Sequence, residues 1–170
     1  MEILIVGIIV VALMAWGSTR IKRTAAAAFG AETIETDEFI LKKPDGWLSI
    51  IEPREPYMFE GYTRDFGPPP DENIRLGTAQ IEVKKGNIDE IAALIAKGGQ
   101  IEDDIREVIN DRRYRVLKLT RSVDDLNRLE WVKLGEADGR VYTLSVRILA
   151  DTTADQAKHI EGMVDSFEIK

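Results

Sequence analysis

Most nucleophilic and transition-metal chemistry in proteins depends on histidine or cysteine, and this chain has one histidine and no cysteine. A catalytic triad or a histidine metal site would therefore have to use His159. His159 follows Lys158 on the predicted polar face of the last helix, so we interpret it as a solvated residue. The lack of cysteine excludes disulfides, a thiolate zinc site and a thiol nucleophile.

Carboxylates could act as general acids and bases or bind divalent cations, and they cluster at two places. Residues 102–107 contain four acids, and Asp124 stands beside Asp125. Neither group has the ligand spacing of a calcium loop, and acids at a helix start complement the helix dipole. We therefore favour solvated acids over a metal site.

The glycine motifs of nucleotide and acyl-transfer enzymes are missing from the sequence, namely G-x-G-x-x-G, G-x-x-x-x-G-K and G-x-S-x-G. The sequence thus predicts a protein that is not an enzyme and that has no cofactor and no metal. An unrecognised hydrolase or metal enzyme remains the second alternative.

Two groups of side chains are candidates for partner contact. Arg112, Arg113 and Arg115 surround a tyrosine in an otherwise acidic domain, although they would equally serve to close a helix C-terminus. The second group consists of aromatic residues in a proline-bearing loop, which suit docking but could instead cover a sheet edge. These aromatic candidates are Tyr57, Phe59, Tyr62 and Phe66.

The first 30 residues have the pattern of a membrane anchor. Residues 3–16 carry no charge and three cations follow them, whereas a signal peptide carries its cations before the apolar run. Seventeen uncharged residues, 3–19, would span about 26 Å as a helix, and long cations can snorkel to the interface. The predicted anchor side chains are Ile3, Leu4, Val6, Ile9, Val10, Leu13, Trp16, Arg20, Lys22 and Arg23.

The order of charges also predicts topology. Cations that follow the apolar run favour an N-terminus outside and a domain in the cytoplasm, held at an inner or intracytoplasmic membrane. We expect an anchor with a helical extension at 1–30, a linker at 31–37 and one domain at 38–170. Without the anchor region, 20 basic and 29 acidic residues remain, so nucleic acid is not an expected partner.

Alternation of apolar and polar residues predicts six strands, at 39–44, 47–51, 79–84, 115–120, 128–134 and 141–149. Asn87 should cap a helix, and a final helix should begin near Thr152 or Thr153. Apolar spacing also predicts a second short helix at 101–109, and the stretch 52–73 reads as loop with a short strand near Tyr62. This order predicts the α+β class. We expect a single N-terminal transmembrane helix, followed by an antiparallel sheet flanked by helices.

The domain resembles a known family. Phe39, Pro44, Gly46 and Trp47, the hairpin at 138–144 and the closing run 164–167 are similar to the PsbP-like α/β/α sandwich superfamily. This superfamily includes an extrinsic photosystem II subunit and a Ran-binding nuclear transport factor. The resemblance implies a small non-enzymatic domain that binds and stabilises larger assemblies.

Together these features predict a membrane-anchored structural or accessory subunit of a larger membrane protein complex. Its expected partners are other transmembrane subunits and the lipid bilayer. The resemblance makes a photosynthetic reaction-centre or light-harvesting complex the first expectation. A free membrane-tethered binding or assembly module is the alternative.

Overall fold

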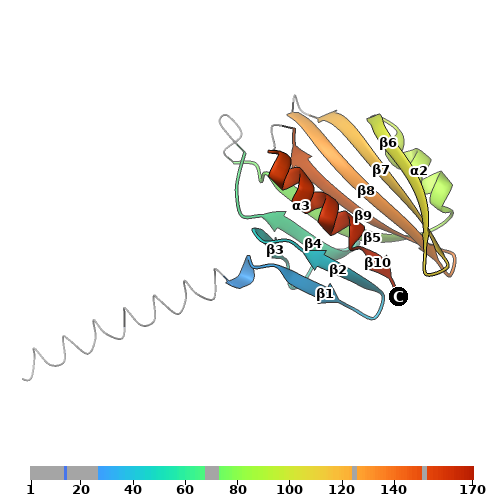
Figure 1. The fold of residues 1–170 in the computed structure, drawn as a ribbon, viewed down its shortest axis with the longest axis horizontal. Coiled ribbons are helices and arrows are strands. Elements are labelled where there is room, and N and C mark those ends of the chain that lie inside the picture. Colours follow the sequence, from blue (N-terminus) through green and yellow to red (C-terminus); the bar gives the residue numbers. More distant parts are fainter. Residues whose placement is uncertain (1–13, 15–26, 68–72, 124–125, 151–152) are drawn as a thin grey trace, which may run out of the picture.

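The computed structural model describes residue 14 and residues 27–67, 73–123, 126–150 and 153–170, apart from the Ala154 side chain (Figure 1). These residues form ten strands and two helices along the chain. The elements are β1 (Glu32–Glu35), β2 (Phe39–Lys43), β3 (Trp47–Ser49), β4 (Tyr57–Thr63), β5 (Gly77–Lys85), α2 (Ile88–Ala96), β6 (Gln100–Ile109), β7 (Arg112–Val123), β8 (Leu126–Ala137), β9 (Arg140–Leu149), α3 (Ala154–Asp165) and β10 (Glu168–Ile169).

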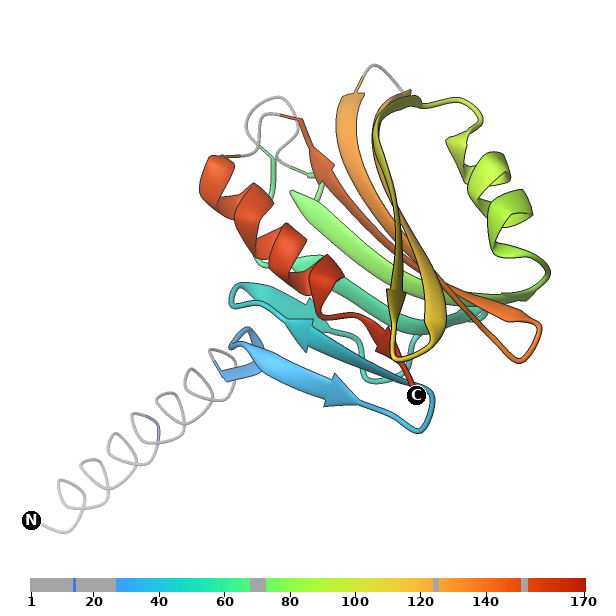
Figure 2. The same ribbon diagram turned by 45° about the vertical axis from the view of Figure 1, so that its right-hand side comes forward.

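Seven strands form one sheet in the order β3-β4-β5-β9-β8-β7-β6, with every neighbouring pair antiparallel. A second sheet has the order β1-β2-β10. The helix α3 and the small sheet lie on one face of the large sheet, and α2 lies on the other (Figure 2). The α+β class and the antiparallel sheet flanked by helices are therefore confirmed.

The two faces of the large sheet bury separate apolar cores. On the α3 face, Trp131, Tyr142 and Phe167 are at most 4% exposed. On the α2 face, the helix packs Ile88, Ile91 and Ala92 onto a short row of apolar residues from β7, β8 and β9. The α2 core is the smaller one, and beyond it the sheet face becomes polar.

Both described helices begin where the sequence predicts. The Asn87 side chain accepts a hydrogen bond from the Asp89 backbone N–H at 2.8 Å, which satisfies a free donor at the start of α2. At the start of α3, Thr153 and Gln156 exchange side chain and backbone hydrogen bonds in a capping box.

The predicted helix at 101–109 is wrong, because this stretch forms the edge strand β6. The apolar residues fit a helical spacing by coincidence, since an edge strand exposed on both faces has no buried period to follow. A bulge between Ile101 and Asp103 also breaks the alternation expected of a strand. Asn110 and Asp111 both have positive φ and turn the chain tightly into β7.

Two stretches expected to be mainly irregular contain more strand than the sequence predicts. Within the expected linker at 31–37, β1 pairs with β2, so this stretch belongs to the small sheet. Within 52–73 the expected strand near Tyr62 is confirmed as β4, which is seven residues long and pairs with both β3 and β5. Polar composition hid β1, because its four residues are exposed or only half-buried and carry no apolar alternation.

The described residues include no helix that is both long and apolar enough to span a membrane. The ten side chains predicted to form the anchor lie between residues 3 and 23, and all ten are outside the described residues.

Candidate functional site

The N-terminal segment is fastened to the domain by a buried lysine. The side chain of Lys43 is 1% exposed, and its ammonium donates to the carbonyl oxygens of Ala28 at 3.0 Å, Gly30 at 2.7 Å and Trp47 at 2.7 Å. Residues 27–30 form a helical turn, so the cation sits where the helix leaves carbonyls without partners. The end of this helical turn is therefore held against β2 and β3.

Two further contacts hold the same segment. The backbone N–H of Gly46 donates to the Phe29 carbonyl at 2.7 Å, and the Arg64 guanidinium lies 6.0 Å from the centroid of the Phe29 ring. The N–H of Arg64 in turn donates to the Gly46 carbonyl at 2.7 Å. The turn at 44–46 thus joins the N-terminal segment to the end of β4.

A partly exposed stack of aromatic rings and an arginine adjoins this junction. The guanidinium of Arg75 lies 4.6 Å from the Tyr62 ring centroid and 4.0 Å from that of Phe66. Arg75 also donates to the backbone carbonyls of Thr63 and Arg64, which fixes its position. We call Tyr62, Phe66 and Arg75 the arginine stack.

The other two predicted aromatic contacts, Tyr57 and Phe59, differ in how deeply they are buried. Phe59 is 4% exposed and packs in the α3-face core, so its side chain is not available to a partner. Tyr57 is half-buried. Residues two apart in a regular strand share a face, but the register of β4 shifts between Tyr57 and Phe59, so their side chains do not lie in the same environment.

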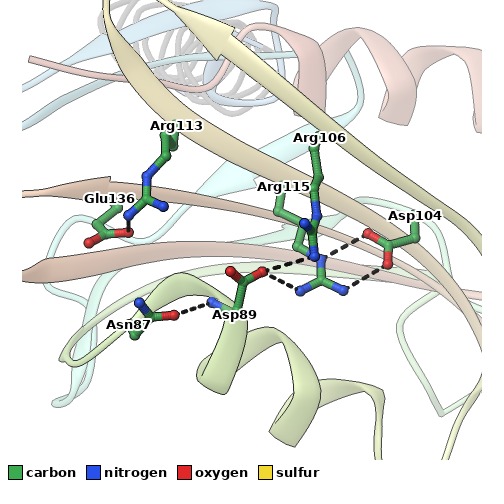
Figure 3. Close-up of polar contacts among 7 residues, drawn as sticks. All are labelled: Asn87, Asp89, Asp104, Arg106, Arg113, Arg115 and Glu136. Atoms are coloured by element: carbon green, nitrogen blue, oxygen red, sulfur yellow. Dashed lines mark hydrogen bonds and ion pairs between the residues drawn. The ribbon is translucent and has the colours of Figure 1, made fainter.

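The predicted basic cluster lies on β7 rather than at a helix end, and two of its three arginines, Arg113 and Arg115, are neutralised within the chain (Figure 3). Arg112 is half-buried, and its buried Nη1 has no hydrogen-bond partner in the part of the chain that the structure describes. Arg115 makes two hydrogen bonds to Asp104, at 2.8 and 2.7 Å, and a third to Asp89 at 2.8 Å. These contacts with Arg115 lower the pKa of the Asp104 carboxyl. Arg113 pairs with Glu136 at 2.6 Å.

A second charge network, centred on a buried carboxylate, lies on the α2 face of the sheet beside the helix. Glu130 is 3% exposed and accepts from Arg121 at 2.6 Å and from Arg147 at 2.8 Å. Arg121 also donates to the carbonyls of Ile95 and Lys97 at the end of α2. A single buried carboxylate thus connects β7, β8, β9 and the C-terminal end of α2.

A groove of about 590 Å³ opens between α2 and this polar part of the sheet. One wall is apolar and consists of Ile91, Leu94 and Ile95 from α2, with Val123 from β7. The floor is polar and charged, with hydroxyls from β9 and cations from several strands. The main floor residues are Lys84, Arg128, Glu130, Thr143, Ser145 and Arg147.

Solved structures with the same architecture come from several organisms. CyanoP, the cyanobacterial PsbP of Synechocystis sp. PCC 6803, has a TM-score of 0.56 at 11% identity, covering 84% of this chain and 94% of its own. LpqN of Mycobacterium tuberculosis has a TM-score of 0.55 at 17% identity, covering 83% and 91%. The Saccharomyces cerevisiae Ran-binding protein Mog1p has a TM-score of 0.51 at 8% identity, covering 83% and 96%.

The fold is PsbP-like. No protein-family model matches the sequence, and no curated protein sequence matches it either. At identities of 8–17% the structural likeness establishes the fold alone, so the function has to be argued from the residues of this chain.

The residues considered for catalysis lie apart in the PsbP-like domain. His159 is exposed on α3, and the acids of β6 pair mainly with bases of neighbouring strands, as Glu102 does with Lys118 and Glu107 with Lys133. Asp124 and Asp125 lie outside the described residues. Among the residues that the structure describes, no group of three or more histidine and acidic side chains could hold a metal ion.

Sequence reasoning missed the groove. Its residues come from α2, β5, β7, β8 and β9, and in the sequence they look like ordinary apolar helix positions and ordinary polar strand positions. The one available signal was that Arg128, Glu130, Ser145 and Arg147 alternate with apolar residues in two successive strands. This alternation predicts a polar sheet face, but it does not show that the face is hollowed.

Proposed function

We propose that this chain is a non-enzymatic accessory subunit. Residues 1–30 hold it at a membrane, and its PsbP-like domain binds and stabilises a larger membrane protein assembly. Support for the anchor comes from the uncharged apolar run at 3–16 and the three cations that follow. Support for a binding role comes from the fold, which also occurs in the Ran-binding protein Mog1p.

One observation carries this proposal, the attachment of residues 27–30 to the domain through Lys43. A tethered domain on a free linker would need no such contact. Here a buried cation, one backbone hydrogen bond and the contact of Arg64 with the Phe29 ring hold residues 27–30 against the domain. A rigid connection lets a span and a domain engage one assembly together, and two modest contacts then reinforce each other.

The arginine stack is the surface we propose for the domain's contact. Tyrosine, phenylalanine and arginine are enriched at protein interfaces, and Phe66 is 47% exposed. Arg75 of the stack donates to the carbonyl of Arg64, whose guanidinium lies over the Phe29 ring, so the stack lies on the side where the N-terminal segment meets the domain. Of the other predicted contacts, Arg113 and Arg115 are committed to ion pairs within the chain, and Arg112 is half-buried on β7.

Among membrane assemblies, the likeness to CyanoP favours a photosynthetic reaction-centre or light-harvesting complex. The alternative is a free membrane-tethered module that visits its partners transiently. A permanent subunit is recovered with its partners at a fixed ratio, whereas a visiting module is not. A hydrolase or metal enzyme remains the least supported reading, because His159 and the acids do not converge.

The proposed topology places the domain in the cytoplasm. Because the chain lacks cysteine, one cysteine introduced at Asp138, at the tip of the β8–β9 turn, would be the single reactive thiol. We expect this thiol to resist a membrane-impermeant reagent in intact cells and to react after lysis. Labelling of intact cells would place the domain on the outside.

The accessory role is tested by co-purification in mild detergent from native membranes. A fragment of residues 27–170 keeps the carbonyls that Lys43 binds, so we expect it to fold. We expect the full chain to recover transmembrane proteins at a fixed ratio and the fragment to lose them. If the fragment recovered them equally well, the N-terminal segment would be no more than a tether.

The proposed contact is tested in the full chain by Phe66→Ala, with Ile51→Ala as the matched control. Both side chains are exposed and apolar, and Ile51 is 96% exposed outside the arginine stack. We expect Phe66→Ala to reduce recovery of the same transmembrane proteins severalfold and Ile51→Ala to leave it unchanged. Equal recovery with both variants would remove the arginine stack from the interface.

A further inference from the structure

We propose that the groove between α2 and the polar sheet face binds a small organic anion with an apolar body, a carboxylate or a phosphate monoester. This activity is separate from the proposed assembly role, since the groove and the arginine stack share no residue. The inference rests on an unpaired arginine, on an exposed apolar rim and on the volume between them.

The unpaired arginine is Arg128. Its Nε is buried and has no hydrogen-bond partner in the part of the chain that the structure describes. In the sheet it stands directly opposite Arg121, and like charges in this position repel each other. Arg121 is neutralised by Glu130, but no described carboxylate pairs with Arg128. A buried guanidinium N–H without an acceptor costs free energy, which an anionic ligand would recover.

The other charged side chains of the groove all have a partner of opposite charge, although two arginines share one carboxylate. Glu82 pairs with Lys84 at 2.8 Å, and Glu130 is shared between Arg121 and Arg147. Six charged side chains line the groove, four basic and two acidic, in a chain whose net charge is −7. This local excess of positive charge against an acidic background favours an anion over a cation.

The recognition chemistry follows from the arginine. A guanidinium presents parallel N–H donors that match two oxygens of one carboxylate or phosphate. The hydroxyls of Thr143 and Ser145 line the same floor and can donate to further oxygens. Arg147 pairs through Nε and Nη1 and is 40% exposed, so its second terminal nitrogen remains free in the described structure.

The apolar wall selects for more than a simple ion. Leu94 is 62% exposed and Val123 is 47% exposed, and both line the groove together with Ile91 and Ile95. Apolar side chains along a charged floor are typical of sites for ligands with a polar head and an apolar body. A volume of about 590 Å³ is within the range of sites for organic ligands and far exceeds that of a lone phosphate.

The test is calorimetric titration of the full chain in nanodiscs of zwitterionic lipid, with empty nanodiscs as the reference. The probes are 2-naphthoate, 2-naphthyl phosphate and the neutral 2-naphthalenemethanol. We expect at least one anion to bind at least tenfold more tightly than the neutral probe. Comparison of the two anions shows which head group the site prefers. If neither anion bound more tightly than the alcohol, the proposal would be overturned.

Two variants locate the site, with a matched control for the charge change. We expect Arg128→Gln to weaken binding of the preferred anion at least tenfold. Leu94→Gln should weaken it at least threefold by removing the apolar wall. Arg113→Gln removes an exposed arginine of β7 outside the groove and should change the affinity less than twofold.

Each result bears on the proposal. Anion binding that persists unchanged in both Arg128→Gln and Leu94→Gln would place the anion elsewhere and refute the site. If Arg128→Gln fails to fold, Leu94→Gln and the comparison of charged with neutral probes still decide. Leu94 is mostly exposed, so its replacement leaves the core intact.

Discussion

Replacing Glu130 by alanine is expected to lower the free energy of unfolding by about 3–5 kcal/mol. This is the largest loss that we expect from replacing a single charged residue. The carboxylate is 3% exposed and neutralises two guanidinium groups, at 2.6 and 2.8 Å. Its removal leaves Arg121 and Arg147 without their counter-charge beside the unpaired Arg128. Domains of this size have a total stability of only ~5–15 kcal/mol, so this loss is a large share of the free energy of unfolding.

The measurement is urea unfolding of the full chain in detergent, followed by the fluorescence of buried Trp47 and Trp131. Glu136→Ala is the matched control, because Glu136 lies on the same strand and pairs with an arginine that is 60% exposed. An exposed pair of this kind contributes roughly 0–1 kcal/mol. Equal losses for the two variants would show that the Glu130 network does not stabilise the fold. Glu130→Gln, which keeps the size and one acceptor, separates the charge from the packing.

Replacing Lys43 by methionine should cost about 2–3 kcal/mol and should also release the N-terminal segment from the domain. Methionine fills a similar volume but donates no hydrogen bond to the carbonyls of Ala28, Gly30 and Trp47. The loss of the buried charge offsets part of this cost, which keeps the expected value below that for Glu130.

Hydrogen exchange tests the release directly. The N–H of Gly46 donates to the Phe29 carbonyl, so its exchange should accelerate at least tenfold in Lys43→Met if the segment detaches. Lys42→Met is the matched control, since Lys42 is the neighbouring exposed residue of β2. We expect the control to stay within about 0.5 kcal/mol of the parent chain. Parent-like exchange at Gly46 in Lys43→Met would show that the lysine does not hold the segment.

Lys43 is one of three cations with the same structural role. Lys43, Arg121 and Lys133 each donate to carbonyls at the end of a helical segment, with Lys133 bonding the Asp165 carbonyl of α3 at 3.1 Å. Neither α2 nor α3 carries a basic residue in its own last turn. The cations that complement the helix dipoles are therefore supplied from neighbouring strands.

Much of the fold was predictable from local patterns. Strands with one buried face show their alternation, and the caps at Asn87 and Thr153 mark helix starts by chemistry that acts within three residues. The edge strand β6 was mistaken for a helix, because an edge exposed on both faces has little alternation to read. The candidate contact Phe59 was misplaced because only the register of β4 decides which aromatic residues face the core.

By itself the sequence determined the α+β class, most strands, both helix starts and the lack of cysteine chemistry, since each depends on residues close together in the chain. Tertiary structure alone decided the functional surfaces. Glu130 contacts cations 9 and 17 residues away, and Lys43 contacts carbonyls 13 and 15 residues before it. Such contacts depend on sheet register and on which strand end meets which helix, and no short-range pattern records either. The arginine stack, the anion groove and the attachment of the N-terminal segment therefore emerged only when the strands were in place.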